Sequence, residues 1–224
     1  MRDYFEVLKS VALFEGIDSA DLGSMLDCLG AKRKTVAKDE IVLLAGERPR
    51  DIGIILMGQL HIIREDYDGN RSLIAAVAPG EIYADTLCCA SIRESPETVI
   101  ANTPSTVLLL HFTRVLHVCP NTCSFHEKLI ENMLRLIAGK HLLLQSHLEI
   151  ISLKSVRAKV MRYLETFRAI QGSEITVPFN REDLANYLCV DRSALSHELM
   201  KMKHDGLIEY SKNRFSLLEG RISN

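Results

Sequence analysis

The stretch NREDLANYLCVDRSALSHELMKMKHDGL, residues 180–207, predicts two short helices on either side of a tight turn. Asn180 can cap the first helix with its side-chain oxygen, and Asp183 can reach back to the helix start, as in a capping box. Residues 189–191 form the turn, and Asp191 can cap the second helix. This arrangement predicts a helix-turn-helix, a motif whose second helix enters the major groove of DNA.

The second predicted helix separates its apolar residues from its polar ones. Leu195, Leu199 and Met202 recur at helical spacing, so we expect them to face the core. Polar side chains are left on the outer face, where a recognition helix meets base edges and phosphates. The candidate DNA contacts are Arg192, Ser193, Ser196, His197 and Lys201 on this helix, together with Arg181, Lys212 and Arg214 outside it.

A short hairpin is predicted after the second helix. Gly206 can end the helix because glycine adopts positive φ without strain, and residues 207–218 then fold back on themselves. A helix-turn-helix followed by such a hairpin is a winged helix. Lys212 and Arg214 at its tip either contact a phosphate backbone or belong to an ordinary solvated turn, and both interpretations stay open.

The length and charge of the chain favour two domains with different roles. A chain of 224 residues is long for one domain, and its 47% hydrophobic residues indicate a globular protein with material for two cores. The net charge of −2 argues against nucleic-acid binding by the whole chain. Residues 152–224, however, carry 12 Lys and Arg against 9 Asp and Glu, which permits DNA binding by the C-terminal domain.

The cysteines and the apolar pattern bear on the compartment. The six cysteines, at positions 28, 88, 89, 119, 123 and 189, lack the paired spacings of a disulfide framework, as expected for reduced thiols. No apolar run reaches the roughly 18 residues of a membrane span, and the start carries acidic residues where a signal peptide is apolar. We therefore expect a cytoplasmic protein with no membrane partner.

Short apolar segments in the N-terminal half predict an antiparallel β-roll. Residues 4–30 have helical spacing, and short segments separated by turns follow from Lys32. The clearest hairpin turn is Asp68-Gly69, because both central residues of that turn type need positive φ. With the helical C-terminal domain, the roll predicts an α+β fold. The expected strands are 40–44, 53–57, 60–64, 72–77 and 107–111.

A heptad pattern predicts one long helix over about residues 123–151. The stripe could be the buried face of an amphipathic helix on the roll, or the seam of a dimer. We favour the seam, because a second apolar stripe, Leu129, Met133, Leu136 and Leu143, is available to pack on the roll. The predicted seam residues are Ile130, Leu134, Ile137, His141, Leu144, Leu148 and Ile151.

The order of these elements resembles the superfamily of the cyclic-AMP receptor protein and the fumarate-nitrate reduction regulator (CRP/FNR). The resemblance is carried by Gly46-Glu47, Gly58 and Pro79-Gly80-Glu81-Ile82 in the roll, and by residues 180–207. It implies a sensor domain at 1–151 that includes the dimerisation helix, and a winged helix-turn-helix domain at 152–224.

The resemblance also implies a function. We expect a homodimeric bacterial transcription regulator, not an enzyme, that binds a palindromic site in double-stranded DNA and senses a small-molecule effector or a redox signal in the roll. RNA polymerase would be a further partner of an activator. Relatives usually carry Arg in place of His197, and several carry Glu in place of Ser193, so the operator sequence cannot be copied from them. Cys189 stands where relatives usually have Gly, so we expect modest strain or an altered turn there.

Two departures from the family argue against cyclic AMP as the effector. The Gly-Glu pair of the family's phosphate cassette aligns with Ala84-Asp85, and its Arg-Ser or Arg-Ala pair aligns with Ser95-Pro96. The Arg that would neutralise the cyclic phosphate is missing, and Pro96 has no backbone N–H. The N-terminal cysteine cluster of iron-sulfur members is also missing, since Cys28 stands alone.

The cofactor is not assigned by the sequence. A haem, metal or thiol sensor stays open, because Cys119, Cys123 and His126 form a loose metal spacing, although we favour packed or semi-exposed thiols as the explanation of the cysteines. A cupin-like metalloenzyme is a weaker alternative, since His61 and His111 stand alone rather than as a close pair. Candidate effector-pocket residues are Tyr83, Asp85, Cys88, Cys89, Glu97, Thr98, Phe125, Leu129, Ile130 and Met133.

Overall fold

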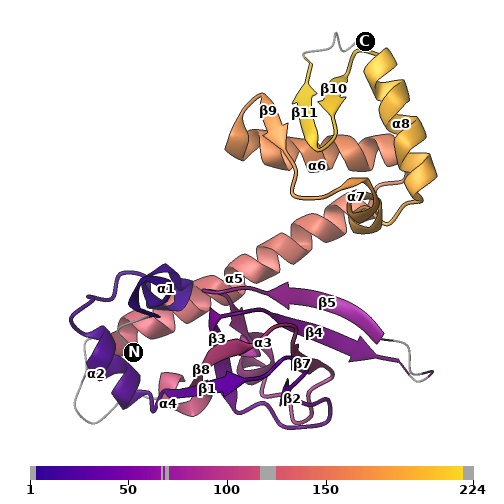
Figure 1. Ribbon diagram of the computed structural model, residues 1–224. Coiled ribbons are helices and arrows are strands. Elements are labelled where there is room, and N and C mark those ends of the chain that lie inside the picture. Colours follow the sequence, from indigo (N-terminus) through magenta and orange to yellow (C-terminus); the bar gives the residue numbers. More distant parts are fainter. Residues whose placement is uncertain (1–3, 67, 69–70, 117–124, 219–224) are drawn as a thin grey trace. The chain divides into compact units, whose positions relative to one another are not determined.

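The computed structural model describes residues 4–66, 68, 71–116 and 125–218, and it divides into two compact units, Met1–Gly139 and Lys140–Asn224 (Figure 1). The helix α5 (Phe125–Ser152) begins in the first unit and ends in the second. The division falls before the predicted boundary at 151, because the last turns of α5 pack on the C-terminal core through Ile150. None of the helices in the described part of the chain is long and apolar enough to cross a membrane.

The N-terminal unit contains two four-stranded antiparallel sheets, which confirms the predicted roll and the α+β class. One sheet has the order β1-β8-β3-β6 and the other β2-β7-β4-β5. The strands are β1 (Lys32–Val36), β2 (Ile41–Leu43), β3 (Asp51–Met57), β4 (Leu60–Glu65), β5 (Arg71–Val77), β6 (Ile82–Tyr83), β7 (Thr98–Ala101) and β8 (Ser105–His111). The pairing of β4 with β5 confirms the predicted hairpin, although Gly69 in its turn lies outside the described residues.

Short helices join the N-terminal part of α5 in one core of this unit. The helices are α1 (Phe5–Ser10), η2 (Ala12–Phe14), α2 (Leu22–Cys28), α3 (Asp85–Cys89) and α4 (Phe112–Leu116). Their apolar residues pack with Ile52 and Ile54 of β3 and with Leu108 and Leu110 of β8. Alternate residues of a strand point to opposite faces, so both pairs lie on the same face of their sheet. This core attaches α5 to the roll.

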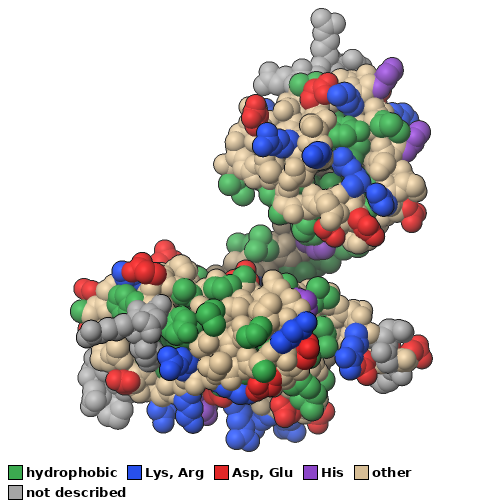
Figure 2. Space-filling view, viewed as in Figure 1, with side chains coloured by type: hydrophobic (Ala, Val, Ile, Leu, Met, Phe, Trp, Pro, Cys, Tyr) green, Lys and Arg blue, Asp and Glu red, His purple; other side chains and the backbone are tan. Residues whose placement is uncertain are grey.

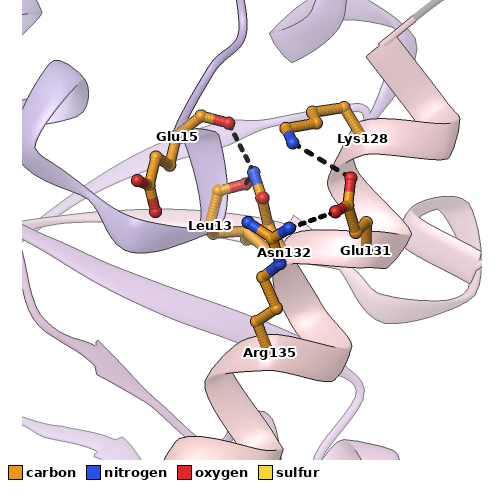
Figure 3. Close-up of polar contacts among 6 residues, drawn as sticks. All are labelled: Leu13, Glu15, Lys128, Glu131, Asn132 and Arg135. Carbon is orange, nitrogen blue, oxygen red and sulfur yellow. Dashed lines mark hydrogen bonds and ion pairs between the residues drawn. The ribbon is translucent and has the colours of Figure 1, made fainter.

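A buried amide also fastens α5 to the N-terminal segment (Figure 3). The Nδ2 of Asn132 donates to the backbone oxygens of Leu13, at 3.0 Å, and Glu15, at 2.7 Å. On the neighbouring turns of α5, Lys128 donates to Glu131 at 3.0 Å, and Arg135 pairs with the same carboxylate. These contacts hold the pKa of Glu131 below its usual value. Asn132 therefore sets where η2 lies along α5.

The C-terminal unit is a small helical domain with a three-stranded sheet. Its elements are the end of α5, α6 (Val156–Gln171), β9 (Glu174–Thr176), α7 (Arg181–Tyr187), α8 (Arg192–His204), β10 (Ile208–Ser211) and β11 (Arg214–Leu217). The sheet order is β10-β11-β9. β10 and β11 form the predicted hairpin, which we call the wing. The helix-turn-helix and the wing are thus both confirmed as structures.

The helix ends of the motif follow the sequence in part. The side chain of Asn180 accepts hydrogen bonds from the amides of Glu182 and Asp183, at 2.9 and 3.0 Å, as predicted. Gly206 has a φ of 71° after the end of α8, also as predicted. Asp191 is the N-cap residue of α8, as predicted, but its side chain makes no cap hydrogen bond, so that part of the prediction was wrong. α8 depends instead on packing of its buried face.

Candidate DNA-binding surface

The turn between α7 and α8 is held by a buried ammonium group. The Nζ of Lys159, on α6, donates to the backbone oxygens of Leu188, at 3.1 Å, and Cys189, at 3.4 Å. These oxygens lie where α7 ends and would otherwise lack helical partners. Cys189 has a φ of 51°, a left-handed conformation that favours glycine. Lys159 was not identified from the sequence, because an isolated lysine on a helix is usually solvated.

Two further contacts orient the motif. Arg157, on α6, binds Glu198 at 2.6 Å and Asp205 at 2.7 Å, so it spans the second half of α8. Hydrogen bonding to Arg157 lowers the pKa of Asp205. On the other side, His147 of α5 donates to the backbone oxygen of Tyr187 at 2.7 Å, and the two rings stack with centroids 4.1 Å apart. The motif is therefore supported from α5 and from α6.

The outer face of α8 presents most of the predicted DNA contacts. Arg192, Ser193, His197 and Lys201 are exposed, and Ser196 is half-buried. Leu195, Leu199 and Met202 on the opposite face are fully buried, as predicted. Figure 2 shows Lys, Arg and His side chains along the side of the C-terminal unit that carries α8. The exposed residues Met200 and His204 lie on the same outer face and were missed, because the prediction centred on the N-terminal half and took only Lys201 from the second half.

The wing places the remaining candidates in different environments. Lys212, with a φ of 54°, and Arg214 are exposed at the tip. The guanidinium of Arg181 lies over the rings of Tyr210, at 5.2 Å, and Phe215, at 5.7 Å, and burial lowers its pKa. Arg181 also donates to the backbone oxygen of Lys212 at 3.3 Å. Arg181 therefore holds the wing against α7, whereas the two tip residues are free to meet a phosphate.

The candidate effector residues of the roll are mostly core residues. Tyr83, Asp85 and Cys88 are buried, whereas Cys89 is exposed. Burial, with the nearby acidic groups, raises the pKa of the Cys88 thiol to about 12, so it stays protonated at neutral pH. Phe125, Leu129 and Met133 fill the same cluster as Cys88, and Ile130 is half-buried. This part of the predicted pocket is packed with side chains.

The residues that align with the phosphate cassette make local contacts. Ala84 has a φ of 60° and precedes α3. Ser95 is buried, and its hydroxyl donates to the backbone oxygen of Glu97 at 2.7 Å. The carboxylate of Glu97 pairs with Arg64 at 2.9 Å, and the hydroxyl of Thr98 accepts from the amide of Ala45 at 3.1 Å. Both side chains therefore have structural partners.

The metal candidates are only partly described. Cys119 and Cys123 lie outside the described residues, and His126 is buried beside Phe125, with ring centroids 4.8 Å apart. Within the described ranges, no three His, Cys, Asp or Glu side chains gather as metal ligands would. His61 lies on β4 and His111 on β8, in different sheets, so the cupin arrangement is not formed.

The predicted dimer seam is largely uncovered in the single chain. Leu134, Leu144 and Leu148 are 67%, 57% and 54% exposed, and His141 is also exposed. Ile130, Ile137 and Ile151 are half-buried. In the second stripe Leu129 and Met133 are buried, whereas Leu143 is exposed. Only the beginning of the second stripe therefore packs on the roll.

These features define a class of protein: a DNA-binding transcription regulator with an N-terminal sensor domain. Two domain families match the chain, the cyclic nucleotide-binding domain over residues 33–121 and the Crp-like helix-turn-helix domain over residues 158–219. The chain belongs to the CRP/FNR superfamily, whose members are transcription regulators rather than enzymes. No curated protein sequence matches it significantly.

Solved structures share the fold at low sequence identity. The Thermus thermophilus catabolite activator protein matches with a TM-score of 0.55 and 17% identity, covering 93% of this chain and 94% of its own. DNR from Pseudomonas aeruginosa matches with a TM-score of 0.53 and 19% identity, covering 98% and 95%. CLP from Xanthomonas campestris, described as a c-di-GMP-responsive global regulator, matches with a TM-score of 0.56 and 13% identity, covering 88% and 99%.

Proposed function

We propose that the chain acts as a cytoplasmic homodimer that binds a two-half-site operator, with each α8 in the major groove. The observation that carries this proposal is the outer face of α8, where the exposed Arg192 and Lys201 flank hydrogen-bonding side chains. Centres of the half-sites lie one helical turn apart, or a multiple of it, because the two recognition helices of a symmetric dimer reach the same side of the duplex. RNA polymerase is a further partner if the protein is an activator.

The exposed seam of α5 supports the dimer. Leu134, Leu144 and Leu148 would each expose apolar area to water in a monomer, and pairing two copies of α5 removes that area. His141, in the middle of the stripe, is exposed and can fix the register of the pair. Sedimentation equilibrium tests this state, and Leu144→Glu should dissociate the dimer by placing a charge in the seam.

The effector is proposed to be something other than a cyclic nucleotide. Ser95 offers no charge to a cyclic phosphate, and its hydroxyl is already bonded to the backbone of Glu97. Pro96 has no N–H to offer, and Arg64, the nearby cation, is paired with Glu97. An apolar organic ligand or a haem suits the largely apolar candidate residues better. Calorimetry with cyclic AMP should show no micromolar binding.

A second candidate signal is redox or metal chemistry at the cysteines. The exposed Cys89 favours it, because an accessible thiol next to the buried Cys88 is open to oxidation. An absorption spectrum and metal analysis of anaerobically purified protein distinguish haem, iron-sulfur and metal sensors from a thiol. Mass spectrometry of molecules that copurify with the protein identifies a bound organic effector.

DNA binding is tested with a promoter-derived palindrome over a range of salt concentrations. Affinity should fall steeply with salt because phosphate contacts release counterions. Arg192→Ala should weaken binding by about 1–3 kcal/mol while leaving the free energy of unfolding unchanged. Arg93→Ala, an exposed arginine of the sensor unit, is the matched control and should bind normally. No binding under any ligand or redox condition would contradict the proposal.

A further inference from the structure

The outer face of α8 carries an exposed apolar side chain at its centre. Ser193, His197, Met200 and His204 follow spacings of four, three and four, so they form one stripe along the helix. The three fully buried residues of α8 lie on the opposite side. Met200 is 59% exposed, in the middle of the surface that is turned away from the core. Its neighbours in the stripe are a hydroxyl and two imidazoles.

Two charged residues of α8 outside this stripe have partners on other elements, whereas Lys201, next to Met200, is exposed. Glu198 is bound by Arg157 of α6, and Lys203 pairs with Glu209 of β10. Both pairs draw their side chains toward the body of the domain. Met200 is therefore available to contact a partner that binds the outer face of α8. Its side chain has no charge and no hydrogen-bond donor.

Base edges in the major groove offer one apolar feature, the 5-methyl group of thymine. A methionine side chain is unbranched and polarizable, so it adapts to an apolar partner of irregular position. We propose that Met200 reads the 5-methyl group of a thymine in each half-site. The inference rests on the proposed DNA binding and deepens it, because it assigns one position of an operator whose sequence the relatives do not supply.

The alternative occupant of the space in front of Met200 is a phosphate, and it makes a different prediction. A phosphate offers charged oxygens, which a thioether cannot satisfy, so Met200 would then be indifferent to DNA sequence. A thymine contact instead makes affinity depend on a single methyl group. The two cases separate by replacing thymine with deoxyuridine, which removes only that methyl group.

The experiment uses the full-length protein and a random duplex library. Sequences enriched by binding give the half-site, and each thymine is then replaced by deoxyuridine in both half-sites. Fluorescence anisotropy gives Kd for the natural chain, for Met200→Ala and for Ile170→Ala. Ile170, on α6, is an exposed apolar residue outside the DNA-facing helix, 84% exposed against 59% for Met200, and its variant serves as the control.

The expected result is one thymine position at which deoxyuridine weakens the natural chain by about 4-fold per half-site, the effect of one buried methyl group. Met200→Ala should bind the thymine duplex correspondingly more weakly and be insensitive to deoxyuridine at that position. Ile170→Ala should behave as the natural chain does. The inference is overturned if no thymine shows the penalty, or if Met200→Ala retains it. A protein that enriches no sequence would instead contradict the proposed DNA binding.

Discussion

The recognition helix α8 and the segment Ala84–Cys89 of the roll differ in where their chemically active side chains point. On α8 the core takes only apolar residues, and Arg192, His197 and Lys201 face outward. In the roll segment Asp85 and Cys88 are buried, and Cys88 lies in the same cluster as the apolar residues of α5.

The difference shows why the sequence reveals a DNA-binding surface more readily than an internal ligand site. A DNA-reading surface is built by excluding polar residues from the core, so its periodicity in sequence reveals it. A ligand site inside a domain is lined by residues that resemble core residues. Their sequence pattern therefore predicts core packing and does not indicate a ligand. Variants of adjacent residues on opposite faces of α8 therefore test the comparison most strongly.

Leu199→Ala should produce the largest effect. Leu199 is fully buried in the C-terminal core, and its truncation leaves a cavity that costs about 2–5 kcal/mol. Met200→Ala, one residue later, should change the free energy of unfolding by no more than about 0.5 kcal/mol, because the side chain is solvated. Denaturant unfolding followed by circular dichroism measures both. Equal losses would mean that the two faces of α8 are assigned wrongly.

The buried face of α8 could be predicted from the sequence, whereas one strand of the roll could not. Leu195, Leu199 and Met202 were predicted as core residues because spacings of four and three place them on one face of the helix. The other faces carry mostly polar residues. β1 was not predicted, because Lys32 to Thr35 are mostly polar and the strand is defined by its pairing with β8. Local pattern carries no information about such pairing partners.

The sites divide in a similar way. The exposed contacts of α8 follow from its period, but the role of Arg181 under the wing depends on Tyr210 and Phe215, which are distant in sequence. The contacts of Lys159 likewise arise from a turn 29 residues away. The effector candidates came from the resemblance alone, and no residue pattern could distinguish a ligand contact from packing.

Lys159→Met sharpens the comparison, because it removes a polar group that points inward in the DNA-binding unit. Two carbonyl oxygens at the turn would lose their donor, at a cost of about 1–3 kcal/mol in the free energy of unfolding. Lys154→Met, an exposed lysine shortly before α6, is the control and should be near neutral. If only Lys159→Met lowers the free energy of unfolding, the result supports the role of Lys159 in stabilising the turn. No cost would show that water replaces the ammonium group.

Cys189→Gly should have a smaller effect of opposite sign. Cys189 has a φ of 51°, and glycine relieves a left-handed strain while adding entropy to the unfolded chain, so we expect stabilisation by about 0.5–1 kcal/mol. Cys189→Val, with a branched side chain, should destabilise the protein at the same position. Thermal unfolding of both variants decides the matter. If the two changes have the same sign, the backbone at this turn is not the cause.

The smallest expected effect concerns acid stability of the contact between α6 and α8. Arg157 lowers the pKa of Asp205 from its ordinary value of 3.8. A carboxylate whose pKa is lower in the folded state binds protons more readily when unfolded, so its contribution is present above the ordinary value and is lost as pH falls through the folded one. The natural chain should therefore lose stability more steeply than Asp205→Asn as pH falls below about 4. Unfolding followed at several pH values measures the difference, and parallel curves would mean that solvent screens the pair completely.

Because Glu198 still binds Arg157 in the Asp205→Asn variant, DNA recognition by the outer face of α8 should be unchanged. This control separates a role of Asp205 in stability from a role in DNA binding.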